Sequence, residues 1–202
     1  MSADSLVLRD LVFAAAGGTA IAAACGLRAF LPLVALSLGV RFGLVHVAPA
    51  AAWIGGTPAL VTLLWATVVE LAADKVPALD HLLDLFGTAL RPLAAGLAGW
   101  CTFQGLHPVL AVAASVVLGA GAMGVHVAKA KVRLGSSIVT LGHANPMLSA
   151  VEDAVALGLS AMAVLVPLAA LAAVVLLAWA LRRAFPTPAH HRSAPRVLPP
   201  AG

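Results

Sequence analysis

The sequence Glu70-Leu-Ala-Ala-Asp-Lys-Val-Pro-Ala-Leu-Asp-His-Leu-Leu-Asp84 gathers acids, bases, a histidine and a proline at the end of an apolar run, Ala59–Ala73. A charge at bilayer depth costs about 3 kcal/mol on insertion scales, so it needs a partner or a function. Glu70 and Asp74 are four residues apart and share one helix face, and Pro77 ends or kinks that helix. The stretch therefore predicts a membrane helix that carries ionisable side chains.

The second half of the quoted stretch has a different pattern from the first. Asp80, His81 and Asp84 alternate with leucines at helical spacing. This pattern is typical of an amphipathic helix that lies at the membrane surface with its leucines in lipid. Only the first half, Glu70 to Lys75, is a candidate for a functional site. The alternative interpretation is an ordinary helix end at the membrane interface, where the charged side chains reach water.

The composition of the whole chain agrees with a membrane protein. The 202 residues are 62% hydrophobic and 10% charged, with a mean hydropathy of +1.04. A soluble domain carries about 25% charged residues. The net charge of +4 comes without a soluble basic domain, so we expect no nucleic-acid partner. The composition predicts an all-α, polytopic membrane helical bundle.

The pattern of apolar segments predicts five or six spans, some of them short or re-entrant. Arg28 lies between the apolar pieces Leu11–Leu27 and Ala29–Leu38. Either one long tilted helix carries this arginine, or the second piece is a re-entrant half-helix. Gly26 and Pro32 bracket Arg28 as helix breakers do, which favours the half-helix.

The remaining segments follow from prolines and glycines. We expect a loop at Leu44–Pro58, an apolar segment that opens at Arg91-Pro92 and runs to Phe103, a span that starts at His107-Pro108, a polar linker at Ile138–Pro146, and an apolar stretch at Ala154–Leu181 that bends at Pro167. Residues 1–181 form the predicted membrane domain. Residues 182–202, rich in proline and arginine, form a predicted disordered tail on the cytoplasmic side of the inner (cytoplasmic) membrane.

Two parts of the chain resemble each other. Glu70-Leu-Ala-Ala-Asp-Lys-Val76 aligns with His126-Val-Ala-Lys-Ala-Lys-Val132, and Gly26-Leu-Arg28 aligns with Gly105-Leu-His107. The identities are few, and alanine-rich chains produce such matches by chance. If the repeat is real, pseudo-symmetric halves bring Glu70 and Asp74 toward His126 and Lys129.

Several motifs together resemble a known family. They are Gly26-Leu-Arg-Ala-Phe-Leu-Pro32, Glu70-Leu-Ala-Ala-Asp-Lys75, Leu79-Asp-His-Leu-Leu-Asp84, Arg91-Pro92, Val125-His-Val-Ala-Lys129, and Asn145-Pro146 followed by Glu152-Asp153. The sequence from about Leu11 to Leu181 is similar to an uncharacterised bacterial integral membrane family, domain of unknown function 4126. The resemblance implies an integral membrane protein and brings no established activity.

The leading hypothesis for function is a small transporter or channel-like protein for an ion or small polar solute. Its tentative site consists of the ionisable residues of the apolar segments, namely Arg28, Glu70, Asp74, His126 and Lys129. Glu70 is the favoured proton- or cation-binding carboxylate. Arg28 needs a counter-ion, for which Glu70 or Glu152 would serve. A structural, hydrogen-bonded histidine is an equal alternative for His126.

The alternative hypothesis is a non-transporting membrane protein that binds an anionic lipid headgroup or a protein partner. Its tentative site is the basic cluster and the hydroxyls that follow it, namely Lys129, Lys131, Arg133, Ser136 and Ser137. Cations and hydroxyls together bind phosphate and carboxylate groups. The same cations are also typical of the positive-inside signal of cytoplasmic loops.

An enzyme is the less favoured class. Ser136, Ser137 and His143 match no nucleophile motif, and the chain has no nucleotide loop or metal-ligand spacing. The pair His190-His191 in the tail is a weak metal candidate. We expect no cofactor and no metal. Membrane lipids are the expected partners, and small-residue spacings that indicate close helix packing leave a homo-oligomer open.

Overall fold

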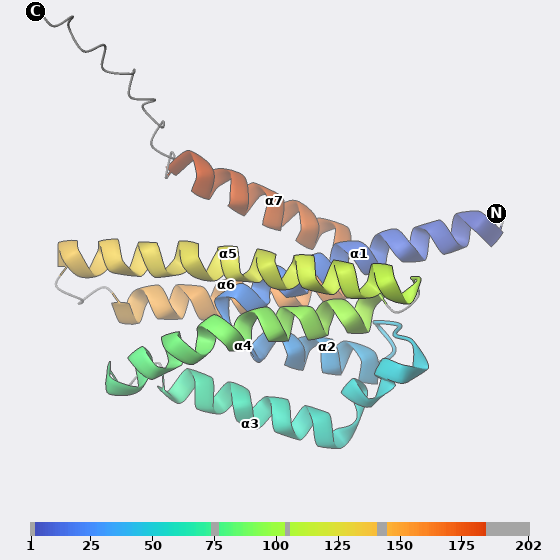
Figure 1. The fold of residues 1–202 in the computed structure, drawn as a ribbon, viewed down its shortest axis with the longest axis horizontal. Coiled ribbons are helices and arrows are strands. Elements are labelled where there is room, and N and C mark those ends of the chain that lie inside the picture. The colour runs from blue at the N-terminus through green and yellow to red at the C-terminus, as the bar shows by residue number, and fades with distance from the viewer. Residues whose placement is uncertain (1–2, 74–76, 104–105, 141–144, 185–202) are drawn as a thin grey trace, which may run out of the picture.

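The computed structural model describes residues 3–73, 77–103, 106–140 and 145–184, and all regular structure in these ranges is helical (Figure 1). The elements are α1 (Ala3–Leu27), α2 (Leu31–Arg41), a 3-10 helix η1 (Pro49–Gly55), α3 (Thr57–Ala73), α4 (Pro77–Phe103), α5 (Pro108–Thr140), α6 (Asn145–Leu165) and α7 (Pro167–Ala184). The predicted all-α class is therefore confirmed for the described residues.

Helix α1 lies at the centre of the bundle and packs against α4, α5, α6 and α7. Helices α4 and α5 form a closely packed hairpin, and α2 packs on both α3 and α6. The buried core is made mostly of alanines, and α1 and α4 supply several of them, such as Ala20, Ala24, Ala95 and Ala98. Because these side chains are small, the helix backbones approach closely, as is usual for membrane helices.

Two glycines lie where helices approach closely and a backbone carbonyl is a near neighbour. A Cβ atom at Gly26 would lie 2.6 Å from the Cβ of Val125 on α5 and 2.7 Å from the Ala122 carbonyl oxygen. A Cβ atom at Gly119 would lie 2.9 Å from the carbonyl oxygen of Pro92 on α4. Only a residue without a side chain fits at either position without displacing its neighbour.

Within the part of the chain that the structure describes, three helices are long and apolar enough to cross a membrane, namely Leu8–Leu27, Pro108–Ser136 and Met147–Leu165. The count becomes four if η1 and α3, which meet at 54°, act as one bent span. Two shorter apolar helices, Leu31–Arg41 and Pro167–Ala180, lie beside them. The chain is therefore a multi-pass membrane protein by the length and apolar character of its helices.

Most breaks in the helices occur where the sequence analysis expected them. Helix α1 ends before Arg28, α2 is a separate helix of 11 residues, and the helix at the C-terminal end is interrupted next to Pro167. Helix α2 ends at Arg41, and Gly43, which follows its C-cap Phe42, has a φ of 71° that is accessible to glycine at little cost. The predicted loop after it contains η1, which is held to α2 by a hydrogen bond of 2.6 Å from Ser37 Oγ to the Ile54 carbonyl.

Two predicted boundaries are wrong. Pro92 does not open a helix but lies inside α4, which also includes the segment predicted to be a separate interfacial helix. Helix α5 runs through Gly135 and continues to Thr140, so Ile138 belongs to the helix rather than to the linker predicted at Ile138–Pro146. In a bundle, neighbouring helices tolerate an internal proline, and one glycine costs only about 1 kcal/mol relative to alanine.

The ends of the helices gather at two ends of the bundle. In Figure 1, α2 and α4 end, and α3 and α5 begin, at the end of the molecule that carries η1. Helix α3 ends, and α4 and α6 begin, at the opposite end. We call these the η1 end and the α6-start end.

Candidate functional site: a charged cluster at a helix break

The candidate site lies where α1 ends and α2 begins. Between these helices the chain turns through Arg28, Ala29 and Phe30, and Arg28 is buried with 1% of its surface exposed. Pro32 occupies the first turn of α2, where its missing N–H removes no helix hydrogen bond. The sequence therefore produces a helix break inside the bundle and places an arginine at it.

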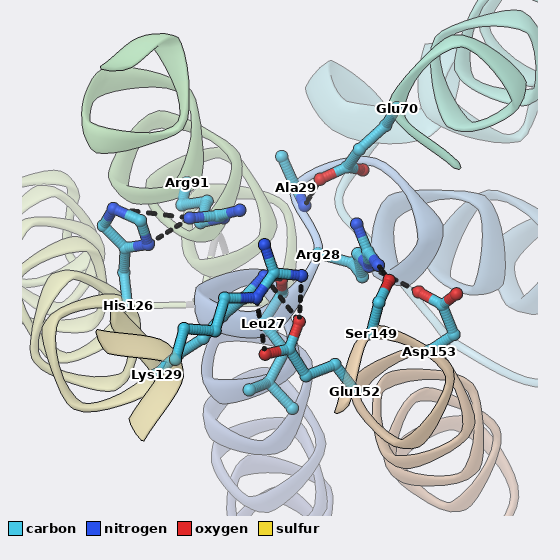
Figure 2. A network of polar contacts seen from close by, with 11 residues as sticks. Leu27, Arg28, Ala29, Glu70, Arg91, His126, Lys129, Ser149, Glu152 and Asp153 are labelled. Carbon is cyan, nitrogen blue, oxygen red and sulfur yellow. Dashed lines mark hydrogen bonds and ion pairs between the residues drawn. The ribbon is translucent and has the colours of Figure 1, made fainter. Parts of the chain in front are cut away.

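Ionisable side chains from other helices bind the polar ends that this break exposes. Lys129 Nζ on α5 donates a hydrogen bond to the Leu27 carbonyl oxygen, at 3.3 Å, at the C-terminus of α1. The Glu70 carboxylate on α3 accepts hydrogen bonds from the Ala29 N–H at 2.9 Å and the Phe30 N–H at 3.2 Å (Figure 2). A cation therefore caps the negative end of one helix dipole and an anion caps the positive end of the other.

The Arg28 guanidinium is held by two residues of α6. Its Nε lies 2.5 Å from Asp153 Oδ1, and its Nη2 donates a hydrogen bond of 2.9 Å to Ser149 Oγ (Figure 2). The sequence analysis expected Glu70 or Glu152 as the counter-ion, and the ion pair instead forms with the residue that follows Glu152. Neighbouring acids on a helix point in different directions, so sequence alone did not separate Glu152 from Asp153.

Glu152 itself pairs with two cations of α5. Its Oε2 lies 2.8 Å from Lys129 Nζ and 3.0 Å from Arg133 Nη2, and its Oε1 accepts a further bond of 3.3 Å from Arg133 Nε. Lys129 and Arg133 are four residues apart and share one helix face. All three side chains are buried. One carboxylate of α6 therefore bridges two cations of α5.

A second polar contact joins α4 to α5 beside this pair. The Arg91 guanidinium on α4 faces the imidazole of His126 on α5, with a short contact to Nδ1 (Figure 2). The Thr88 hydroxyl lies 3.5 Å from His126 Nε2. Arg91 and His126 are both buried. The sequence analysis treated Arg91 as the start of a helix. Its position before the 12 apolar or small residues Pro92–Phe103 was the signal that could have identified it.

These contacts define what we call the charged cluster, composed of Arg28, Glu70, Arg91, His126, Lys129, Arg133, Ser149, Glu152 and Asp153. It receives residues from α3, α4, α5, α6 and the break between α1 and α2. Four of the five residues predicted for the solute site, namely Arg28, Glu70, His126 and Lys129, lie in it. The fifth, Asp74, lies outside the described residues.

The residues predicted for an anionic headgroup do not lie on one surface. Lys129 and Arg133 are buried in the charged cluster, whereas Lys131 is exposed on α5. Ser136 is half-buried on the same helix, and Ser137 belongs to the helix although its side chain lies outside the described residues. His143 and the pair His190-His191 also lie outside the described residues. Among the described residues, no group of three or more His, Cys, Asp or Glu side chains is placed to hold a metal ion.

A comparison with known families identifies the chain. The model of one family, described as domain of unknown function (DUF4126), matches residues 15–187. No curated protein and no solved structure matches the chain. The match extends from within α1 to beyond the end of α7, and so includes all elements of the charged cluster. The chain therefore belongs to the family defined by the domain of unknown function DUF4126.

Proposed function

We propose that this membrane protein is a small transporter or channel for an ion or small polar solute, and that the charged cluster is its solute site. The observation that carries the proposal is the break between α1 and α2, whose two helix ends both face buried ionisable side chains. Discontinuous helices whose ends meet inside the bundle frame the solute sites of many secondary transporters.

The lengths of the helices support a position of the break deep in the membrane. Helix α2 runs from the break to the η1 end in 11 residues, which rise about 16 Å. This is about half of a hydrocarbon core that is about 30 Å thick. Glu70 lies about 20 Å along α3 from its start at the η1 end. The turn between α1 and α2 and the Glu70 carboxylate that binds it therefore belong near the middle of the membrane.

The amount of buried charge also supports a function beyond packing. Four cations, Arg28, Arg91, Lys129 and Arg133, are buried together with the carboxylates of Glu70 and Glu152. Replacing a buried ion pair by apolar side chains is often neutral or stabilising, so the fold alone does not require these charges. Ionisable side chains inside a membrane bundle are typical of ion and solute pathways.

The proposed topology has five crossings and one re-entrant hairpin. Helices α3 to α7 cross in turn, and α1 and α2 enter from the η1 end and return to it. The cations Lys131, Arg182 and Arg183 then belong to the α6-start end, which we assign to the cytoplasmic face of the inner membrane by the positive-inside rule. This assignment places the C-terminus in the cytoplasm and the N-terminus on the opposite side.

The test is solute flux into proteoliposomes with a matched pair of variants on α5. Lys129→Gln removes a cation of the charged cluster, and Lys131→Gln removes an exposed cation two residues away. The assay uses a panel of small anions, cations and neutral solutes, and we expect the wild type and Lys131→Gln to transport one of these classes. For that class, the transport rate of Lys129→Gln should fall by about tenfold or more, and a tenfold loss corresponds to about 1.4 kcal/mol.

Two results would contradict the proposal. One is that no solute enters faster than in empty liposomes. The other is equal flux in wild type and Lys129→Gln. If the lipid-headgroup alternative is correct instead, Lys131→Gln is the variant that weakens binding to anionic vesicles, because Lys131 is the exposed cation of the three.

A further inference from the structure

The contact between α5 and α6 depends on Glu152. Helix α5 packs extensively on α4 and α1, and α6 packs on α1, α2 and α7, but α5 and α6 have few residues near each other. Across this sparse interface, Glu152 of α6 binds Lys129 at 2.8 Å and Arg133 at 3.0 Å. The carboxylate therefore links α6 to the α4–α5 hairpin through two buried cations.

The two cations that Glu152 binds form a recognition pattern for an oxyanion. Arg133 directs two N–H groups at the two carboxylate oxygens, and Lys129 adds a point charge to one of them. A planar guanidinium matches a carboxylate or phosphate with two parallel hydrogen bonds, and a lysine adds charge without fixing the geometry. The Lys129 side chain is 3% exposed and the Arg133 side chain is 10% exposed.

We propose that Lys129 and Arg133 form an anion-binding site, that Glu152 is its internal occupant, and that a small soluble anion bearing a carboxylate or phosphate displaces Glu152 from it. The inference rests on the proposed transport function and specifies the class of its solute. Because Glu152 and the anion compete for the same two cations, removing the Glu152 charge strengthens anion binding.

Displacement of Glu152 also links binding to movement at the helix break. Lys129 donates to the C-terminal carbonyl of α1, and Asp153, next to Glu152, holds Arg28 at the start of the turn into α2. An anion that takes the place of Glu152 releases α6 from the α4–α5 hairpin while Lys129 stays at the end of α1. The two sides of the sparse interface can then separate around the bound anion.

The test measures binding of acetate and of inorganic phosphate to full-length protein in nanodiscs of phosphatidylcholine, with a bulky organic anion as the reference salt at equal ionic strength. We expect Glu152→Gln to bind at least one of the two anions at least tenfold more tightly than wild type. Lys131→Gln serves as the control and binds as wild type does. Lys129→Gln binds at least tenfold more weakly, and this variant keeps the inference testable if Glu152→Gln does not fold.

Equal affinity in wild type and Glu152→Gln, or in wild type and Lys129→Gln, would overturn the inference. A second set of nanodiscs with phosphatidylglycerol separates a soluble anion from a lipid headgroup, and binding that requires the anionic lipid would also overturn it. The flux assay remains separate. If the protein transports a cation and neither acetate nor phosphate changes the rate, the anion site is refuted and the transport function is not. If an anion binds but no solute enters the liposomes, the transport function is refuted and the anion site is not.

Discussion

At the residue scale, the packing of the helices and the capping of their ends depend on positions where the side chain is either absent or charged. Gly26 lies against α5 so closely that even a Cβ atom would overlap Val125 and the Ala122 carbonyl. Glu70 reaches from α3 to the start of α2 and caps it with two hydrogen bonds. The first kind of residue sets how closely the helices pack, and the second holds the polar ends that the helix break exposes.

We expect Gly26→Ala to destabilise the protein by about 1–3 kcal/mol, because the added methyl group overpacks the contact between the break and α5. Gly124→Ala is the matched control, since a Cβ atom there meets nothing within 4 Å. The measurement is the unfolding temperature in detergent, followed by gel filtration after heating. Equal unfolding temperatures for the two variants would show that the close approach at Gly26 is absent.

We expect Glu70→Gln to destabilise the protein by about 1–3 kcal/mol, because an amide has one acceptor oxygen where the carboxylate has two and so leaves a buried backbone N–H unsatisfied. Asp10→Asn, at an exposed acid of α1, is the control and has little effect. Denaturant or thermal unfolding measures both. Wild-type stability of Glu70→Gln would argue against the capping role.

Much of the charged cluster could be predicted one residue at a time. Arg28, Glu70, His126 and Lys129 are identifiable because each is an ionisable residue within an apolar segment. Ser149 and Asp153 were not, because the apolar stretch was predicted to begin at Ala154, and a serine and an acid just before a helix are ordinary there. The pairing of Arg28 with Asp153 depends on the packing of α6 against α1 and α2, and the sequence of one chain does not contain that information.

At the element scale, the helix break is the feature that organises the other helices. Helices α3, α5 and α6 each direct a charged side chain at the short turn between α1 and α2. The break itself was predictable, since Gly26 and Pro32 are strong helix breakers on either side of Arg28. The continuous α4 was not, because Pro92 lies inside a helix whose neighbours compensate for the missing hydrogen bond.

We expect the pair Arg28 and Asp153 to behave as a buried ion pair. Arg28→Met alone leaves the partly exposed Asp153 carboxylate without its counter-ion at 2.5 Å and costs about 3–5 kcal/mol. The double variant Arg28→Met with Asp153→Leu recovers most of that loss, because neither change then leaves an uncompensated charge. A double-mutant cycle on thermal stability measures the coupling.

The exposed pair of Arg9 with Asp10 provides the comparison for that cycle, since its side chains are 56% and 71% exposed. Arg9→Met has little effect on stability, because water screens an exposed pair. If the double variant at Arg28 and Asp153 is as unstable as the sum of its single variants, the two residues do not act as a pair.

At the scale of the whole molecule, the protein is a multi-pass bundle with a charged interior. Composition alone predicts the membrane environment, because a chain with 62% hydrophobic and 10% charged residues has no soluble alternative. The number of crossings is harder to predict. Helix α4 carries Arg91 within its apolar half, and α2, with 11 residues, is too short to cross the membrane. Length and apolar character therefore identify neither helix as a membrane span.

We expect the N- and C-termini to lie on opposite sides of the membrane, with the C-terminus in the cytoplasm, because α3 to α7 give an odd number of crossings and α1 with α2 add none. Reporter fusions measure this. A fluorescent protein at the C-terminus should be active and alkaline phosphatase there inactive, and an N-terminal epitope should be accessible from outside spheroplasts. Two termini on the same side would contradict the topology.

If the charged cluster is the solute site, solute must reach it from water. Cysteine accessibility measures this access. In a chain whose native Cys25 and Cys101 are replaced by serine, Ser149→Cys places a thiol beside Arg28, and Leu157→Cys places one on the exposed apolar face of the same helix. Charged thiosulfonate reagents modify thiolates in water and spare thiols in lipid. We expect the thiol of Ser149→Cys to be modified from one side of the membrane, and we expect the transported solute to slow this modification. The thiol of Leu157→Cys should stay unmodified. A thiol at position 149 that stays as unreactive as the one at position 157, with and without solute, would contradict the assignment of the solute site to the charged cluster.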